Sequence, residues 1–336
     1  MDKRVIFAVA GSGKTTYIVD SLSTEKRSLI VTYTTGNFDN LSKKIADKFD
    51  GKWPDNITLL SYFQFLYRFC YKPFLADRIR ARGIIYDEKL IPQYAKQTDR
   101  CFFLTPGDYF HSNRLAFFLD KYLSKEIKAR IETYYDEFII DEVQDIAGRD
   151  FNFLEKLMMT NVNILFVGDF FQHTYDTSRD GNANKNLFDD RAKYEARFTQ
   201  KGIIPDTTTL KNSWRCSPSV CEFVSINLGI QISSNISEER NTEIRFIEDP
   251  TEKAEILSNS NIIKLHYQES QKYGFDHRNW GETKGEDHYQ DVCVMLNKKT
   301  AKLYRQGKLN ELPPSTRNKL YVAITRAHGN VYFIPE

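Results

Sequence analysis

Cysteine is scarce and unpatterned in this sequence. The five cysteines are an odd number and include no Cys-x-x-Cys pair, which argues against a disulfide framework and against a zinc site. We therefore expect reduced thiols that pack inside a cytoplasmic protein. Long apolar runs are also missing, because the run at 5–10 leads into glycines and is far shorter than a signal sequence or a membrane span. The sequence predicts no segment that crosses a membrane.

Neither sign of charge dominates. The chain has 47 basic and 45 acidic residues, a formal net charge of +2, so any surface for nucleic acid must be local. Low-complexity segments and short repeats are absent as well, which excludes solenoid and disordered classes. With 336 residues, of which 41% are hydrophobic and 27% charged, the chain has the composition of a globular protein and enough length for two units.

Short apolar runs alternate with amphipathic stretches along the chain. Each run is followed by turn or polar residues, which is typical of buried parallel strands. The expected strands are 5–9, 28–33, 138–141, 163–167, 291–296 and 330–334, and the helical spacing is clearest at 40–49 and 151–159. This pattern predicts an α/β fold with parallel sheets flanked by helices. Segment 64–137 lacks the strand rhythm and predicts a helical insertion in a first lobe, 1–200, followed by a second lobe, 201–336.

A glycine-rich loop follows the first expected strand. It reads Ala10-Gly11-Ser12-Gly13-Lys14-Thr15-Thr16 and runs into a helical stretch. In this strand, loop and helix context, backbone N–H groups surround phosphates, the lysine reaches the β and γ oxygens, and Thr15 holds Mg²⁺. Ala8 stands where the formal pattern has a glycine, a change that ordinary backbone angles tolerate. The loop predicts binding of Mg-ATP.

A second strand end carries two carboxylates. Asp141 and Glu142 follow the apolar run Phe138-Ile139-Ile140. Beside a phosphate loop, Asp141 is expected to hold the Mg²⁺ shell, and Glu142 to polarise the attacking water. A solvated turn at a strand end is the alternative for this pair when it is taken alone.

The segment from Asp141 to Asp145, Asp-Glu-Val-Gln-Asp, resembles the Walker B signature of the UvrD/Rep helicases of superfamily 1. Other motifs of that family are matched in the expected order: motif Ia by 32–34, Ib by 58–62, III by 168–172, IV by 210–216, V by 283–287 and VI by 321–327. The similarity spans residues 5–334. It implies two RecA-like P-loop NTPase lobes and a motor that translocates along single-stranded DNA.

The resemblance also implies roles for individual residues. Gln172 would sense the γ-phosphate and the attacking water, Arg215 and Arg326 would be arginine fingers, and Trp214 would stack on adenine. Nucleic-acid contacts would come from Tyr33, Ser61, Phe63 and Tyr175, where aromatic faces stack on bases. A half-buried core tryptophan and salt-bridged arginines are the structural alternatives.

The sequence departs from the UvrD/Rep pattern in three places. It has no adenine-reading glutamine before the P-loop, no tryptophan after motif III where Tyr175-Asp176 stands, and no large insertion between motifs IV and V. Three functions stay open: a single-stranded DNA translocase or helicase, an RNA-directed helicase, and a nucleotide-gated subunit that regulates a protein partner such as a nuclease.

Overall fold

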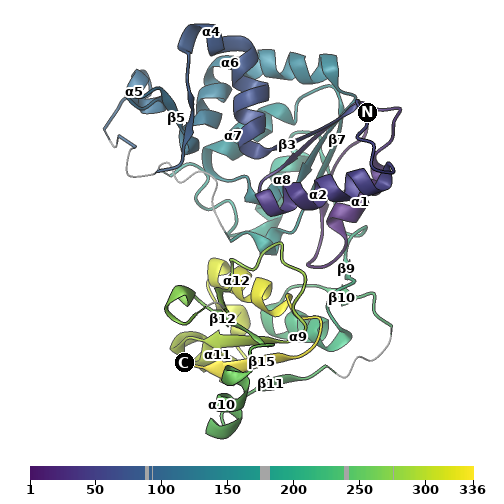
Figure 1. The fold of residues 1–336 in the computed structure, drawn as a ribbon, viewed down its shortest axis with the longest axis vertical. Helices are drawn as coiled ribbons and strands as arrows, with labels where there is room; N and C mark the ends of the chain where they lie inside the picture. Colours follow the sequence, from purple (N-terminus) through teal and green to yellow (C-terminus); the bar gives the residue numbers. More distant parts are fainter. Residues whose placement is uncertain (88–90, 93, 175–181, 238–241, 275) are drawn as a thin grey trace. The chain divides into compact units, whose positions relative to one another are not determined.

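The computed structural model describes residues 1–87, 91–92, 94–174, 182–237, 242–274 and 276–336. They form two compact units (Figure 1). The first unit contains 1–6, 15–168 and the described part of 175–206, and the second contains 7–14, 169–174 and 207–336. The short segments 7–14 and 169–174 thus pack with the C-terminal part, although the sequence pattern placed them in the first lobe. The division of the chain into two functional lobes, 1–200 and 201–336, stays a prediction.

The first unit is built on a six-stranded sheet with the order β3-β2-β6-β7-β1-β8. The strands are β1 (Lys3–Phe7), β2 (Ser28–Thr32), β3 (Ile57–Ser61), β6 (Glu137–Asp141), β7 (Asn163–Gly168) and β8 (Ile204–Asp206). The β2–β3, β2–β6, β6–β7 and β1–β8 pairs are parallel. Ile164 N–H, at the start of β7, donates to the carbonyl of Asp2 beside the start of β1, at 2.9 Å. Strands β7 and β1 therefore run in the same direction.

Helices surround this sheet. They are α1 (Lys14–Ser21), α2 (Thr35–Lys48), α3 (Tyr62–Gln64), η1 (Phe65–Tyr71), α4 (Lys72–Ile79), α5 (Arg100–Phe103), α6 (Ser112–Tyr134), η3 (Val143–Asp145), α7 (Gly148–Leu157) and α8 (Arg191–Thr199). Lys48 fixes α2 against the end of α1, because its Nζ donates to the carbonyls of Val19, Asp20 and Leu22 at 2.7 to 2.9 Å. These bonds satisfy carbonyls that a helix end leaves unpaired.

Most of the described residues in 64–137 are helical. A small parallel pair, β4 (Gly83–Ile85) and β5 (Tyr109–His111), interrupts the helices. The buried Arg114 holds this region together, since its guanidinium lies 3.9 Å from the centre of the Phe102 ring and donates to the Phe102 carbonyl at 3.0 Å. A buried cation thereby keeps both a π face and an acceptor.

The second unit contains a five-stranded parallel sheet with the order β11-β15-β14-β12-β13. The strands are β11 (Ile244–Phe246), β12 (Ile263–His266), β13 (His277–Asn279), β14 (Val292–Leu296) and β15 (Val331–Pro335). Val292, Val294 and Leu296 of β14 belong to one apolar cluster, and Cys293 and Met295 to another. Because successive side chains of a strand point to opposite faces, the sheet is covered on both sides.

The helices of the second unit supply these two clusters. They are η4 (Phe170–Gln172), α9 (Pro218–Leu228), α10 (Pro250–Ser258), η5 (Ser270–Lys272), α11 (Lys298–Arg305), η6 (Leu309–Glu311) and α12 (Pro314–Ile324), with a short pair of strands β9 (Asn212–Ser213) and β10 (Ser233–Ser234). Helices α9, α11 and α12 pack into the first cluster, and α10 packs into the second. No helix in the described ranges is long and apolar enough to span a membrane.

The predicted α/β class with parallel sheets and flanking helices is confirmed. Every expected strand is present within about two residues. The largest shift is at β1, which ends at Phe7 rather than Val9. There the Val9 N–H already bonds to the carbonyl of Leu210, outside the sheet, at 3.0 Å. All five cysteines are free, and Cys101 alone among them is exposed.

Candidate functional site

The phosphate loop leaves the sheet at the end of β1 and enters α1 at Lys14. Gly11 and Gly13 have positive φ angles of 68° and 86°, which residues with a Cβ rarely adopt. The Ser12 N–H turns back to the Val9 carbonyl at 3.3 Å. Within the described chain, the Ser12 hydroxyl oxygen is buried and has no hydrogen-bond partner. A curled backbone with an unsatisfied hydroxyl fits a phosphate group.

The groups expected to hold Mg²⁺ come from the first unit. Asp141 is the last residue of β6 and is 2% exposed, and Thr15 lies in the first turn of α1. A hydroxyl and a carboxylate are the oxygen ligands that Mg²⁺ takes beside nucleotide phosphates. These two residues therefore fit the ion. Thr16 has a separate contact, because its Oγ1 accepts from Lys44 Nζ at 2.8 Å.

Glu142 is held in an unusual backbone conformation directly after β6. Its φ and ψ of 56° and 48° are left-handed, and the residue is 7% exposed. Gln144 Nε2 donates to the Glu142 carboxylate. Gly168 leaves room for this pair, since a Cβ there would lie 2.2 Å from Gln144 Oε1 and 2.9 Å from Val143 Cγ1. Sequence reasoning gave Gln144 no role, although its place in the Walker B segment was a usable signal.

Gln172 belongs to the second unit and is 3% exposed. Its Nε2 donates to Asp169 Oδ2 at 3.0 Å. The same carboxylate oxygen accepts from the Tyr321 hydroxyl at 3.0 Å. Sequence reasoning assigned no function to Asp169 or Tyr321, because no local pattern shows that residues so far apart in the chain are bonded. Their position inside the quoted motifs III and VI was the only available signal.

Trp214 is not a core tryptophan. It is 65% exposed, and its backbone N–H donates to the Gly11 carbonyl at 2.8 Å. The position that a Cβ at Gly13 would take lies 3.9 Å from Trp214 Cδ1. The indole therefore lies beside the phosphate loop within the second unit, with its surface accessible to a planar ligand.

The two predicted arginine fingers have different surroundings in the second unit. Arg215 forms an ion pair with the exposed Asp287 and donates to the Thr325 carbonyl at 3.2 Å. Arg326 is 1% exposed and donates to the carbonyls of Val322, Thr283 and Glu286 at 3.2, 3.3 and 2.9 Å. Burial, followed by the charge of Arg215, lowers the pKa of the Arg326 guanidinium to about 10. It remains charged at neutral pH.

Aromatic side chains gather in the first unit after β2 and β3. The centre of the Phe63 ring lies 6.1 Å from that of Tyr33 and 5.0 Å from that of Tyr86. Tyr86 is 60% exposed and was missed by sequence reasoning. Ser61 caps α3, because its Oγ accepts from the Gln64 N–H at 3.4 Å. Tyr175, the fourth predicted contact, lies outside the described residues.

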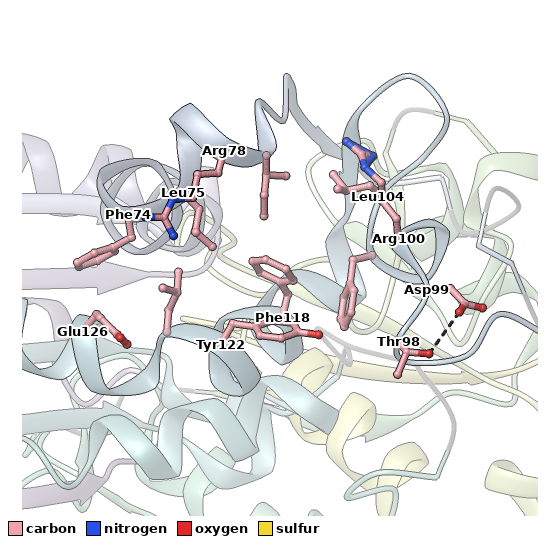
Figure 2. A pocket seen from close by; sticks show the side chains of 13 residues that line it. Phe74, Leu75, Arg78, Thr98, Asp99, Arg100, Leu104, Phe118, Tyr122 and Glu126 are labelled. Atoms are coloured by element: carbon pink, nitrogen blue, oxygen red, sulfur yellow. Dashed lines mark hydrogen bonds between the residues drawn. The ribbon is translucent and has the colours of Figure 1, made fainter.

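A separate cavity of about 690 Å³ lies among α4, α5 and α6 (Figure 2). Figure 2 shows Phe74, Leu75 and Phe118 on its apolar walls, with Arg78 and Glu126 at the edge. None of the residues described above for the phosphate loop, the Mg²⁺ ion or the aromatic cluster lines it. This cavity is therefore distinct from the site that the motifs define.

The chain forms two compact units, each with a parallel sheet flanked by helices, and this α/β fold can be compared with solved structures. The chain is 14% identical to arterivirus nonstructural protein 10, a helicase solved in complex with DNA, with a TM-score of 0.51 over 99% of this chain and 60% of that chain. It is 13% identical to the PRRSV helicase, with a TM-score of 0.50 over 99% of this chain and 52% of that chain. No protein-family model and no curated protein matches the sequence.

These likenesses show that the chain shares the fold of these two helicases. At this level of identity they show the fold alone. The chain spans less than two thirds of the length of either helicase.

The packing around Gly168 generates a first prediction. Gly168→Ala should lower the free energy of unfolding by about 1–3 kcal/mol, because the added methyl overlaps the Gln144 side chain in a packed interior. Thermal unfolding followed by circular dichroism measures the shift. Gly36→Ala is the matched control, since a Cβ there meets nothing within 4 Å and alanine favours a helix. An unchanged melting temperature for Gly168→Ala would contradict the close approach.

Proposed function

We propose that this chain is an ATP-driven motor of the UvrD/Rep type that translocates along single-stranded nucleic acid, with DNA as the favoured strand. One observation carries the proposal. The Asp141–Glu142 pair, the Asp169–Gln172 segment and the phosphate loop follow β6, β7 and β1, which are neighbours in the sheet. Parallel strands place the residues after their carboxyl ends at one edge, where α/β proteins bind ligands.

The proposed chemistry assigns one task to each group. Lys14 binds the β and γ phosphate oxygens, and Thr15 and Asp141 hold the Mg²⁺, which neutralises phosphate charge when bound. Glu142 accepts the proton of the attacking water, and Gln144 keeps its carboxylate in place through the hydrogen bond described above. Arg215 and Arg326 stabilise the charge that develops on the transferred phosphoryl group.

Nucleic acid binding is supported by the aromatic cluster of Tyr33, Phe63 and Tyr86. Partly exposed rings in contact with one another form a platform on which unpaired bases stack, and stacking tolerates any base sequence. Burial raises the pKa of Tyr33 to about 12, so its hydroxyl stays neutral near phosphates at physiological pH. The arterivirus protein of the same fold was solved with DNA, which favours DNA over RNA here.

The nucleotide chemistry predicts that two substitutions separate binding from hydrolysis. Lys14→Ala should abolish both, because the phosphate contact is lost, whereas Glu142→Gln should abolish hydrolysis and retain Mg-ATP binding. Phosphate release and a fluorescent ATP analogue measure the two properties, with single-stranded DNA and RNA of several lengths present or absent. Full turnover by either variant rules out this site. Hydrolysis that RNA alone stimulates indicates an RNA-directed motor, and hydrolysis that neither strand stimulates indicates a regulatory subunit.

Loss of either arginine is expected to slow hydrolysis, but only one of the two losses is expected to destabilise the fold. Arg215→Ala and Arg326→Ala should each reduce hydrolysis at least a hundredfold at saturating ATP, since an arginine finger contributes about 10³ to 10⁵ in rate. Only Arg326→Ala should also lower the melting temperature by several degrees, because it empties a fully buried site and removes the donors to the carbonyls of Thr283 and Glu286. Turnover within a few-fold of wild type in both variants would show that these arginines are structural.

The aromatic cluster predicts that loss of one of its rings weakens the binding of single-stranded DNA. Phe63→Ala and Tyr86→Ala should each weaken binding of an oligothymidine by roughly 5- to 150-fold, because base stacking on one ring contributes about 1–3 kcal/mol. Fluorescence anisotropy at fixed salt measures the affinity. Tyr94→Ala is the control, as Tyr94 is 96% exposed and lies outside the cluster. Equal affinities for all three variants and wild type would place the strand elsewhere.

A further inference from the structure

A continuous set of hydrogen bonds connects three segments of the second unit. The Ala10 N–H of the phosphate loop donates to the Tyr321 hydroxyl oxygen at 2.8 Å. The Tyr321 hydroxyl donates to Asp169 Oδ2 at 3.0 Å, and Gln172 Nε2 donates to the same oxygen at 3.0 Å. The other oxygen of Asp169 accepts from the Phe171 N–H, also at 3.0 Å. The Asp169 carboxylate is therefore fixed through both of its oxygens.

The direction of each bond in this set follows from chemistry alone. A backbone N–H only donates and an ionised carboxylate only accepts, so the Tyr321 hydroxyl must accept from Ala10 and donate to Asp169. Tyr321 is fully buried, and burial, with the Asp169 charge next, raises the pKa of its phenol far above the ordinary value. The hydroxyl therefore keeps its proton at neutral pH.

The same logic fixes the orientation of the Gln172 side chain. A carboxamide presents two donors on one side and an acceptor oxygen on the other. Because the Gln172 oxygen would repel the Asp169 carboxylate, the NH₂ group must face Asp169, as the 3.0 Å contact shows. The acceptor oxygen then points away from Asp169. An acceptor in that position suits a hydrogen of an attacking water, which is the group that the family resemblance implies Gln172 senses together with the γ-phosphate.

We infer that Tyr321 is a positioning residue of the nucleotide site, whose hydroxyl ties the phosphate loop at Ala10 to Asp169 and thereby sets the orientation of the Gln172 carboxamide. This inference rests on the proposed ATPase function. Packing alone does not account for a tyrosine here, because a phenylalanine would fill the same space beside Phe171, whose ring centre lies 6.2 Å away. The hydroxyl adds two directed bonds in a buried place where each bond is costly to lose.

The substitution Tyr321→Phe removes one oxygen and leaves the ring. We expect kcat for ATP to fall about 10- to 100-fold with a change in KM below about threefold, since a misplaced catalytic group costs up to about 10² in rate. The Ala10 amide should also exchange its hydrogen with solvent at least tenfold faster, as measured by amide exchange without nucleotide. Tyr304→Phe is the matched control, because the Tyr304 ring packs on Phe246 and Phe333 in the same unit.

A double-mutant cycle separates positioning from general stabilisation. If Tyr321 acts through Gln172, then adding Tyr321→Phe to Gln172→Ala should lower kcat by less than about twofold further. An equal loss in both backgrounds, or wild-type exchange at Ala10 in Tyr321→Phe, overturns the inference. If Tyr321→Phe does not fold, Asp169→Asn keeps the side-chain shape and should show the same loss of kcat and the same non-additivity with Gln172→Ala.

The two proposals fail in different ways. If the wild-type chain does not hydrolyse ATP, the proposed function is wrong, and the inferred role of Tyr321 in catalysis is wrong with it. Hydrogen exchange at the Ala10 amide still tests the hydrogen bonds of the Tyr321 hydroxyl. Normal hydrolysis by the wild type together with normal kcat for Tyr321→Phe removes the positioning role and leaves the motor intact.

Discussion

The neighbouring order of β6, β7 and β1 is the constraint on which the candidate site depends. Adjacent strands of a sheet lie about 4.8 Å apart, so the residues that follow these three strands start within roughly 10 Å of one another. In the sequence, Gly11 of the phosphate loop and Asp141 at the end of β6 are more than a hundred positions apart. Backbone hydrogen bonds alone thus make neighbours of three strands that are remote in the sequence, before any side chain contributes.

The parts of this arrangement that depend on local sequence could be predicted. Apolar runs ending in polar residues located six of the strands, and the glycine-rich loop and the Asp141–Glu142 pair led to the prediction of a nucleotide site. Five strands of the two large sheets were missed: β3, β8, β11, β12 and β13. Pro205 in β8 weakens a strand pattern, and an edge strand tolerates it. Partners remote in the sequence could not be predicted either. The contact of Gly168 with Gln144, and the three carbonyls around Arg326, exist only once the chain is folded.

Buried charges in the second unit are stabilised in two distinct ways. The Asp169 carboxylate is satisfied by neutral donors, namely a phenol, a carboxamide and a backbone N–H. Arg326 is satisfied by neutral acceptors, the backbone carbonyls. Among the described residues Arg326 has no close ion pair, and the carbonyl dipoles compensate the cost of taking its charge out of water. A guanidinium held by dipoles remains able to attract a phosphate, whereas its charge would be largely cancelled in a closed ion pair.

The left-handed backbone of Glu142 brings fold stability and chemistry into conflict at one residue. A side chain with a Cβ costs about 1–2 kcal/mol in that conformation, and glycine would remove the cost together with the carboxylate. Directed evolution or consensus engineering for heat resistance alone would therefore be drawn towards glycine or asparagine at this position. A more durable protein made in that way would have lost the group that is proposed to act on water.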